Sequence, residues 1–514
     1  MSPGRSSEVA IIGAGPAGLG AARWLIAQGF EPVLLESAAG LGGQWRQDNP
    51  LSGVWRDMRT NTSRVVTRFS DLDWPPGTAV FPHNGEVLAH LEAYAARFDL
   101  HRRLRLGARV ERLERVPGGW RLAWREAGGV QERVFPRAVV ASGRFNAPAV
   151  PDIPGLGAFS GAGGVVHSFE YQAPEGFRGQ RVLVAGGAIS ALEVACDIAM
   201  AGAASVAVAC RRQRYVLPKI AAGVPIDSRF SRYGATAAGT LPPELTVPRL
   251  KAWILARGGD PARHGAAAPA DDPREAGVAL SQYFLGLVAE GRIATRPWLR
   301  RVEGEAVEFA DGAREGFDAI VLGTGFSLRL PFLGEEVRQP LALDDQHIEL
   351  ADYTFHPELE NLAFLGMIPQ TGPYFPVLEL QARYLAYAWG GACPAPTPQR
   401  LAEGIAAYRA ARAGPLIQPM DRVALGFARL AGVEPDLSAH PKLARALLFG
   451  PLTAASFRLQ GPDALPDAAE VIAREAAIHG TAETPAFTAK EQALLRELAE
   501  ASADPAVLRW AELT

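Results

Sequence analysis

The sequence predicts an α/β fold that contains two strand–helix–strand units and ends in a helical carboxy-terminal extension. Two glycine-rich turns are the basis of this prediction, one at residues 13–18 and another far along the chain at residues 186–191. Each turn follows a short apolar run with β character and precedes a run with helical character. After about residue 400 the pattern is helical and rich in Ala and Leu. One such turn is a weak signal, but two in this context predict two Rossmann-like, dinucleotide-binding units.

The first unit is predicted from residues 8–12, 16–28 and 32–36, which have the patterns of a strand, a helix and a second strand. The free N–H groups at the start of this helix would point toward a bound pyrophosphate. Pro16 suits the first helical turn, because its missing N–H has no intrahelical partner there. Glu36 ends the second strand about 20 residues after the turn, where a carboxylate can bind both ribose hydroxyls.

The glycines of the first turn meet three steric requirements of a dinucleotide site. Gly13 permits the tight turn, Gly15 lets the backbone approach a pyrophosphate, and Gly18 allows close packing of helix against strand. The first unit therefore predicts a site that includes Gly13, Gly15, Pro16, Ala17, Gly18 and Glu36.

The second unit is predicted from residues 181–185, 190–201 and 205–210, again as strand, helix and strand. Ala188 and Ala191 replace the second and third glycines of the pattern. Their methyl groups crowd a bound pyrophosphate, so we expect looser binding at this site than at the first.

Two arginines follow the second unit at the position where the first unit has its glutamate. Arg211 and Arg212 suit the 2′-phosphate of NADPH, which favours NADPH over NADH. The alternative interpretation is a pair of solvated surface arginines. Gly186, Ala188 and Ser190 are expected to contact the same dinucleotide.

The composition narrows the functional class. A chain of 514 residues is long enough for two or three domains. Its net charge of −3, without a basic block, argues against a nucleic-acid partner. Three cysteines without a C-x-x-C motif indicate a reducing compartment and argue against a metal site. The first apolar run is too short for a signal peptide, and we expect a cytoplasmic protein without a membrane segment.

With both turns placed, the chain resembles the flavin-containing monooxygenases, a family of class B flavoprotein monooxygenases. The resemblance covers residues 8 to about 390 and depends on motifs that occur in the family's order. These are GAGPAG at 13–18, GGQW at 42–45, RTN at 59–61, F-x-G…H-S-x-x-Y at 159–171, the second turn at 186–191, GTGF at 323–326 with PFL at 331–333, and a flavin-side segment from 355–358 to 379–381.

The resemblance divides the chain into four parts. Residues 1–165 are expected to form the first part of an FAD-binding domain, and residues 331–400 its return segment. Residues 166–330 are expected to form an NADP-binding domain, with a flexible excursion at about 213–280. Residues 401–514 are expected to form the helical extension, whose pattern shows no chemistry.

The resemblance implies FAD at the first site, NADPH at the second, and Asn61 as the catalytic residue. In the family this asparagine lies against flavin and nicotinamide, and its amide donates and accepts hydrogen bonds without titrating. The alternative for Asn61 is a turn residue after Thr60, and the alternative for Trp45 is an ordinary core tryptophan. Further residues implied to bind the cofactors are Gly43, Gln44, Trp45, Thr60, Asn61, Thr324, Gly325, Gly366 and Gln381.

His167 belongs to the F-x-G…H segment, in which five residues rather than the family's three separate Gly161 from the histidine. We expect His167 to couple the two domains and not to act as an acid or base. The segment ends in Tyr171-Gln172, unlike the corresponding segment of the Baeyer–Villiger monooxygenases. Those enzymes also have an aspartate-bearing segment where this chain has Thr60 and Asn61.

The implied reaction is an NADPH-dependent monooxygenation, in which a peroxyflavin formed from dioxygen oxygenates nitrogen or sulfur in a small molecule. Three alternatives stay open: Baeyer–Villiger oxidation of a ketone, a non-catalytic flavin redox sensor, and an NADPH oxidase. The sequence identifies neither the substrate nor the oligomeric state, although a homodimer is the commonest assembly.

Overall fold

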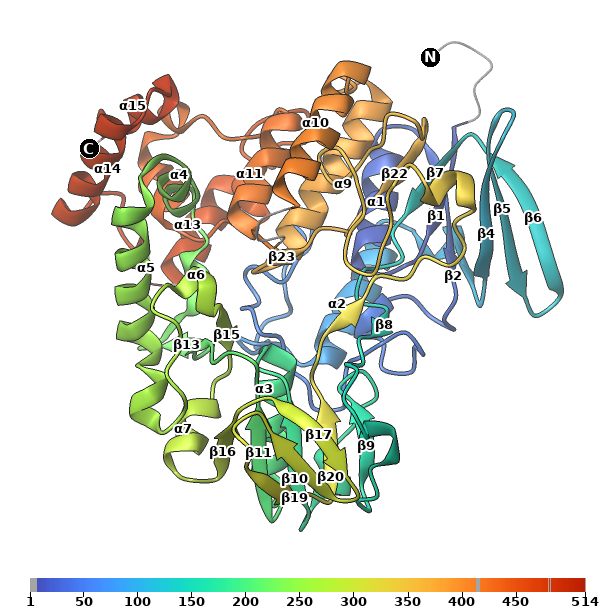
Figure 1. Ribbon diagram of the computed structural model, residues 1–514. Coiled ribbons are helices and arrows are strands. Elements are labelled where there is room, and N and C mark those ends of the chain that lie inside the picture. Colours follow the sequence, from blue (N-terminus) through green and yellow to red (C-terminus); the bar gives the residue numbers. More distant parts are fainter. Residues whose placement is uncertain (1–6, 413–416, 479, 481, 514) are drawn as a thin grey trace.

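The computed structural model describes residues 7–412, 417–478, 480 and 482–513. It contains two five-stranded parallel sheets, one in the upper right and one at the bottom of Figure 1. In spatial order, the first sheet consists of β22 (Leu362–Phe364), β7 (Arg137–Val140), β1 (Glu8–Ile12), β2 (Glu31–Glu36) and β3 (Leu104–Leu106). The second consists of β16 (Ile293–Arg296), β11 (Ser205–Ala209), β10 (Arg181–Ala185), β20 (Ala319–Leu322) and β9 (Gly164–His167).

Both sheets are covered on two faces, as expected for parallel strands. In β1, Val9 and Ile11 pack into the core on the side of α1 (Pro16–Ala27), whereas Ala10 and Ile12 pack into a separate core on the opposite side. That second core includes the antiparallel sheet of β4 (Arg109–Val116), β5 (Gly119–Glu126) and β6 (Gly129–Phe135).

The second sheet repeats this arrangement. Its helical side is covered by α3 (Ile189–Met200) and α7 (Phe284–Ala289). Its opposite side is covered by the antiparallel sheet of β17 (Leu299–Glu303), β18 (Ala306–Phe309) and β19 (Arg314–Gly316). These two units, each with a parallel sheet between two layers, confirm the predicted α/β fold with its two Rossmann-like units.

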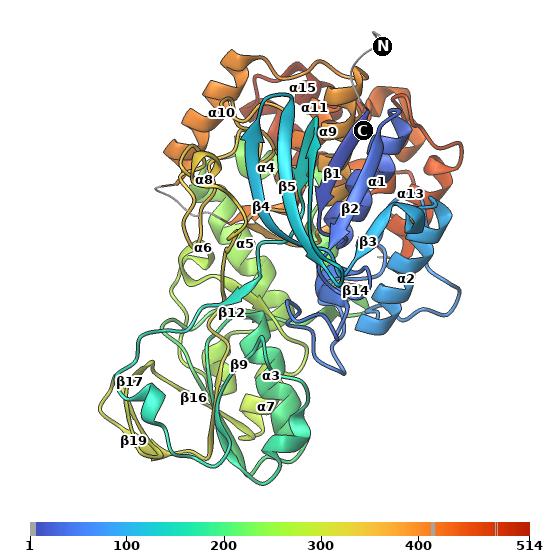
Figure 2. The same ribbon diagram turned by 90° about the vertical axis from the view of Figure 1, so that its right-hand side faces the viewer.

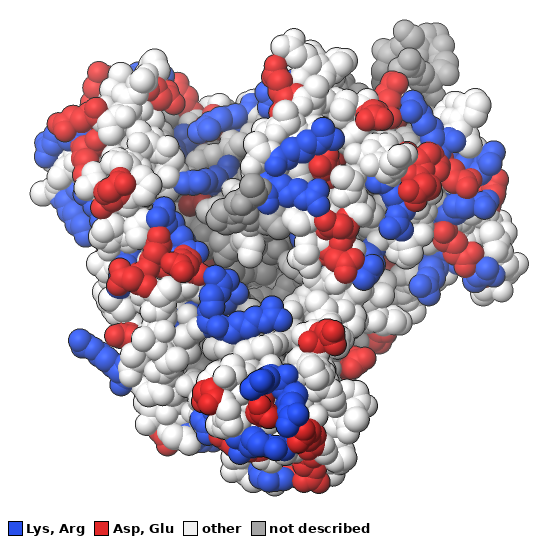
Figure 3. Space-filling model, viewed as in Figure 1, with Lys and Arg blue, Asp and Glu red and all other residues white. Residues whose placement is uncertain are grey.

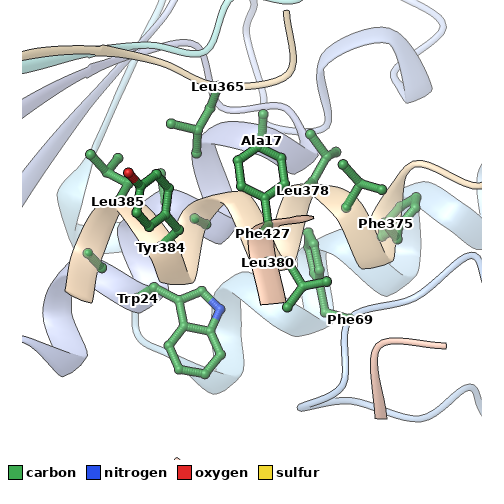
Figure 4. Packing of buried hydrophobic residues seen from close by; sticks show 14 of the residues in the cluster. Ala17, Trp24, Phe69, Leu365, Phe375, Leu378, Leu380, Tyr384, Leu385 and Phe427 are labelled. Atoms are coloured by element: carbon green, nitrogen blue, oxygen red, sulfur yellow. The ribbon is translucent and has the colours of Figure 1, made fainter. Parts of the chain in front are cut away.

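Helix α9 (Phe375–Gly390) lies at the centre of the largest core. It is buried along most of its length and packs against α1. Figure 4 shows its side chains, including Phe375, Leu380 and Tyr384, between residues of other segments such as Trp24 and Phe69. Because α9 contacts α1, the return segment of the chain reaches the turn that precedes α1.

Residues 213–280 have regular secondary structure, although the sequence predicts a flexible excursion there. They include α4 (Arg232–Thr240), α5 (Pro243–Gly258) and α6 (Pro273–Ala276), together with β12 (Tyr215–Leu217) paired in parallel with β15 (Val278–Leu280). The helical pattern of this segment is weak in the sequence, because Pro248 lies inside α5 and Gly and Pro are frequent around it. Whether the segment is flexible stays a prediction.

The carboxy-terminal extension is helical, as predicted, and it lies beside the excursion in both ribbon views (Figures 1 and 2). It contains α10 (Pro398–Ala411), α11 (Met420–Leu430), α12 (Ala444–Phe449), α13 (Ala468–Ile478), α14 (Ala489–Ala501) and α15 (Pro505–Ala511). Within the described ranges, no helix combines the length and the apolar character needed to cross a bilayer.

A buried ionic network joins this extension to the largest core, around α9. The Arg458 guanidinium lies 2.9 Å from Asp71 and 3.5 Å from Glu379, and all three side chains are almost fully buried. Glu379 of α9 also accepts a hydrogen bond from the Ser70 backbone N–H at 2.7 Å. The network therefore connects three segments that are far apart in the sequence.

We expect Arg458→Met to lower the midpoint of thermal unfolding strongly. Removing one partner of a buried ion pair costs about 3–5 kcal/mol, and here Glu379 would stay buried without this counter-charge, whereas Asp71 keeps its ion pair with Arg23 at 2.9 Å. Arg474→Met is the matched control, since Arg474 forms an exposed ion pair with Asp73 in the same region, and such pairs contribute about 0–1 kcal/mol. Equal shifts in calorimetry for the two variants would contradict the role of the network.

Candidate functional site

The first glycine turn connects β1 to α1 at the carboxyl edge of the first sheet. Gly13 has a positive φ of 103°, and a Cβ there would lie 2.7 Å from the Ala141 carbonyl oxygen. A Cβ on Gly18 would overlap the Gly13 carbonyl oxygen. Only glycine fits at both positions, so the start of α1 is held close to the strands with its first N–H groups exposed for an anion.

The turn also meets the second predicted flavin motif. Gly43 begins a short 3-10 helix, Gly43–Trp45, and a Cβ on it would lie 2.9 Å from the Gly15 Cα. Gln44 is exposed, whereas Trp45 is half-buried and packs against the large core. The core contact agrees with the packing alternative for Trp45, while cofactor contacts at Gln44 and Trp45 stay predictions.

Glu36 ends β2 with its carboxylate directed at the turn. One carboxylate oxygen accepts a hydrogen bond from the Ala14 N–H at 2.7 Å, and the other accepts one from the Ala38 N–H at 2.8 Å. The oxygen bonded to Ala38 also accepts a hydrogen bond from the Ser37 hydroxyl at 3.3 Å, whereas the oxygen bonded to Ala14 keeps a second lone pair. The side chain is thus fixed at the strand end where the sequence places a ribose, with acceptor capacity left for a hydroxyl group.

Thr60 and Asn61 lie on one loop and contain two buried polar atoms that have no hydrogen-bond partner among the described residues. These atoms are the Thr60 hydroxyl oxygen and the Asn61 amide oxygen. A buried polar atom without a partner is costly, and a bound group would complete the hydrogen bonding here. This observation fits a cofactor or substrate at the predicted catalytic position.

The loop is held by a residue that sequence analysis missed. Asp227, in the excursion, accepts hydrogen bonds from the Ser63 backbone N–H and, at 3.2 Å, from the Ser63 hydroxyl. Asp227 is buried, so this contact is protected from water. No sequence signal identified it, because the two partners are far apart in the chain and belong to no common motif.

In the second glycine turn, Gly323 at the end of the neighbouring strand compensates for Ala191, which replaces a glycine of the pattern. Gly186 has φ 142°, and a Cβ there would overlap the Gly323 carbonyl oxygen. A Cβ on Gly323 would lie 2.5 Å from the Ala191 Cβ, so the bare Gly323 makes room for the alanine that replaces the third glycine. Ala188 precedes α3 without a side-chain cap, and Ser190 lies in its first turn. The helix start is therefore close to the sheet despite the alanines.

Arg211 and Arg212 follow β11 at the same sheet edge, and both are exposed. The Arg211 guanidinium lies 4.8 Å from the centre of the Trp298 ring. Arg212 donates a hydrogen bond to the Glu275 carbonyl oxygen at 3.1 Å. In the part of the chain that the structure describes, neither arginine forms an ion pair with a carboxylate, which leaves their charge available to an anion.

The surface view places positive charge near a hollow. Figure 3 shows a face that is hollowed at its centre, with Lys and Arg side chains gathered along the lower border, above the second sheet. A cavity of about 380 Å³ is lined by residues from 47–52 and from 169–172. This cavity is therefore lined by residues of both predicted domains.

The connection between the units contains Thr324, Gly325 and His167. The Thr324 hydroxyl donates to the Ala149 carbonyl oxygen at 2.7 Å, and Gly325 has φ 92°. His167 Nδ1 accepts a hydrogen bond from the Phe169 N–H at 3.0 Å, and the ring packs edge-on against Phe326. Burial lowers the pKa of His167, so the ring is neutral near pH 7. These contacts join protein groups to one another, and the role of His167 in coupling the two domains stays a prediction.

Gln381 is fully buried, and its amide is used by the protein itself. Its oxygen accepts a hydrogen bond from the Gly366 N–H at 3.0 Å, and its nitrogen donates to the Tyr353 and Phe364 carbonyl oxygens. The side chain thus holds the loop after β22 against α9. Direct contact of Gln381 with a flavin stays a prediction, and support of Gly366 is what the geometry shows.

Residues 6–479 match the family model described as flavin-binding monooxygenase-like. The chain belongs to this family. It is 29% identical over 488 residues to dimethylaniline monooxygenase (N-oxide-forming) 2 of Oryctolagus cuniculus, covering 89% of each chain. It is 28% identical over 492 residues to flavin-containing monooxygenase 2 of Homo sapiens, again covering 89% of each.

Solved structures share the fold of this family member. S-allyl-L-cysteine S-oxygenase from Allium sativum matches with a TM-score of 0.60 and 24% identity, over 83% of this chain and 88% of that one. Cyclohexanone monooxygenase from Rhodococcus sp. Phi1, bound to NADP+, matches with a TM-score of 0.62 and 17% identity, over 83% and 97%. The protein is an NADPH-dependent enzyme of the flavin monooxygenase family.

Family membership implies FAD and NADPH, and the residues present fit both. The backbone approach at Gly13 and Gly18, together with the Glu36 carboxylate, suits the pyrophosphate and ribose of FAD. Arg211 and Arg212, which form no ion pair with a carboxylate among the described residues, suit the extra phosphate of NADPH. When bound, the flavin supplies electron transfer from NADPH to dioxygen.

We expect Gly15→Val to reduce the flavin content of the purified protein strongly while leaving it folded. The valine side chain would enter the narrow space against Gly43, where a Cβ at Gly15 already lies 3.4 Å from the Gly43 Cα. Flavin absorbance relative to protein absorbance, together with circular dichroism, measures the effect. Gly176→Ala is the control, because a Cβ there meets nothing within 4 Å. Full flavin content in the Gly15 variant would show that the turn does not hold FAD.

Proposed function

We propose that this enzyme transfers one oxygen atom from dioxygen to a nitrogen or sulfur atom of a small molecule. In the balanced reaction, NADPH, a proton, dioxygen and the substrate give NADP+, water and the N-oxide or S-oxide. The observation that carries the proposal is the pair of buried oxygens of Thr60 and Asn61, which have no hydrogen-bond partner in the described part of the chain. A buried amide beside the reacting centre can hydrogen-bond a developing charge without changing its protonation state.

The relatives support attack by a soft nucleophile. The name of the rabbit relative specifies N-oxide formation, and the name of the garlic structure specifies S-oxygenation. The chain also has Thr60 and Asn61 where the Baeyer–Villiger monooxygenases have an aspartate-bearing segment. Ketone oxidation is the second candidate, and the shared fold with cyclohexanone monooxygenase is what favours it.

Water exclusion is the other requirement of the reaction, because reduced oxygen species are otherwise lost as hydrogen peroxide. The loop that contains Asn61 is covered by the excursion, through the contact of Asp227 with Ser63. Ser70, a little further along, is covered by Arg458 of the extension, whose guanidinium lies 2.6 Å from its hydroxyl. We propose that these two segments shield the reacting centre and shape its substrate entrance.

The experiment that tests the proposal compares three substrate classes with the purified, FAD-loaded enzyme. N,N-dimethylaniline, methyl phenyl sulfide and cyclohexanone are each supplied with NADPH and isotopically labelled dioxygen, and products are identified by mass spectrometry. Labelled N-oxide or sulfoxide supports the proposal. Labelled lactone alone would establish the ketone reaction instead. Consumption of NADPH with all electrons recovered in hydrogen peroxide, for every compound, would indicate an oxidase.

We expect Asn61→Ala to decrease the product formed per NADPH consumed by roughly 10-fold or more, since a group that hydrogen-bonds the reacting centre is lost. Flavin reduction by NADPH should change little. Thr62→Ala is the control, because Thr62 lies on the same loop but bonds Thr67 at 2.8 Å. Unchanged coupling in the Asn61 variant would remove Asn61 from the catalytic role.

We expect Arg211→Ala to raise the KM for NADPH by roughly 10- to 100-fold, the effect of losing hydrogen bonds to a charged phosphate. The KM for NADH should stay unchanged, because NADH has no 2′-phosphate. Initial-rate kinetics with both nucleotides measure the difference. Arg300→Ala is the control, since Arg300 is exposed on β17 and pairs with Glu308. A parallel rise for both nucleotides would show that Arg211 does not bind the phosphate.

A further inference from the structure

Trp298 is a tryptophan that no sequence motif pointed to, and it lies directly against the predicted phosphate-binding arginine. The Arg211 guanidinium carbon is 4.8 Å from the centre of the Trp298 ring. The two residues follow neighbouring parallel strands, β11 and β16, in which Ala209 pairs with Arg296. Parallel strands end at the same sheet edge, so the tertiary structure brings them together where ligands bind in such folds.

The tryptophan is a fixed support. Trp298 is half-buried and packs against the core on the side of β17–β19. Its carbonyl oxygen accepts a hydrogen bond from the Ala310 N–H at 2.9 Å, which ties it to the antiparallel sheet. Arg211, in contrast, is exposed. A long cationic side chain beside a fixed aromatic ring is thereby restricted to fewer positions.

The charged side chains near this pair have partners that differ from that of Arg211. Arg296, at the end of β16, is paired with Glu315 at 2.6 Å. Arg212 bonds the Glu275 carbonyl oxygen. Arg211 has no carboxylate partner among residues 7–412 and the other described ranges, and its guanidinium lies against the Trp298 ring. An aromatic ring leaves the hydrogen-bonding edge of a guanidinium open, whereas a carboxylate would occupy it.

We propose that Trp298 is a positioning residue for nucleotide selectivity, which holds Arg211 so that its N–H edge meets the 2′-phosphate of NADPH. The inference rests on the proposed role of Arg211 and adds a residue through which that role is exerted. Because Trp298 acts through the contact of Arg211 with the phosphate, removing the Trp298 ring weakens NADPH binding and leaves NADH binding unchanged.

The experiment uses isothermal titration calorimetry on the FAD-loaded enzyme, with 2′,5′-ADP and 5′-AMP as probes that differ by the 2′-phosphate. Trp298→Leu is expected to weaken 2′,5′-ADP binding by roughly 3- to 10-fold, the size of a cation–π contact, without changing 5′-AMP binding. Trp298→Phe keeps an aromatic face and is expected to restore most of the loss. Arg211→Ala, measured alongside, is expected to lose more than either.

The matched control is Trp253→Leu, which removes the tryptophan of another stacked pair, with Arg257 at 4.4 Å on α5. It should leave both probes unaffected. If Arg211→Ala weakens 2′,5′-ADP binding and Trp298→Leu does not, the inference about Trp298 is overturned and the role of Arg211 stands. If neither variant has an effect, the Arg211 proposal fails and the inference with it. Equal weakening of both probes by Trp298→Leu and Trp298→Phe would also overturn it.

Discussion

The constraint on which the rest of this structure depends is the close approach of backbone to backbone at the carboxyl edges of two parallel sheets. At Gly18 and Gly186 a Cβ would overlap a carbonyl oxygen of the same sheet edge. Each approach brings the start of a helix against the strands, so that free N–H groups collect where a pyrophosphate binds. The flavin and nicotinamide sites proposed here are two copies of this one steric solution.

The second copy shows how the constraint tolerates substitution. Ala191 stands where the pattern asks for glycine, and Gly323 on the neighbouring strand end provides the missing space. This space concerns the packing of the helix against the sheet, and the looser binding expected from the crowding of a pyrophosphate by the alanine methyl groups stays a prediction. A glycine at the end of the facing strand thus provides the space that a glycine on the helix would otherwise provide, and the helix can still pack closely against the strand.

Segments without recognisable motifs complete the site. Asp227 of the excursion bonds Ser63 on the loop with Asn61, Arg458 of the extension bonds Ser70 further along the chain, and Trp298 lies against Arg211. Local patterns predicted the two sheets, their turns and the glutamate at the end of β2, because those features arise from residues close together in the chain. They could not predict Asp227 or Trp298, whose partners are brought near only by folding. Pro248 and the frequent glycines also concealed the helices of residues 213–280.

The sequence by itself determined the class of fold and the positions of two nucleotide turns, because glycine spacing and strand periodicity are set by local sterics. It also identified Asn61, Glu36 and the arginine pair as candidates through their place in motifs. Only the tertiary structure decided that Gln381 bonds the protein's own backbone, that the Thr60 and Asn61 oxygens have no partner among the described residues, and that Trp298 lies against Arg211. Those properties depend on burial and on contacts between distant segments, which no local pattern encodes.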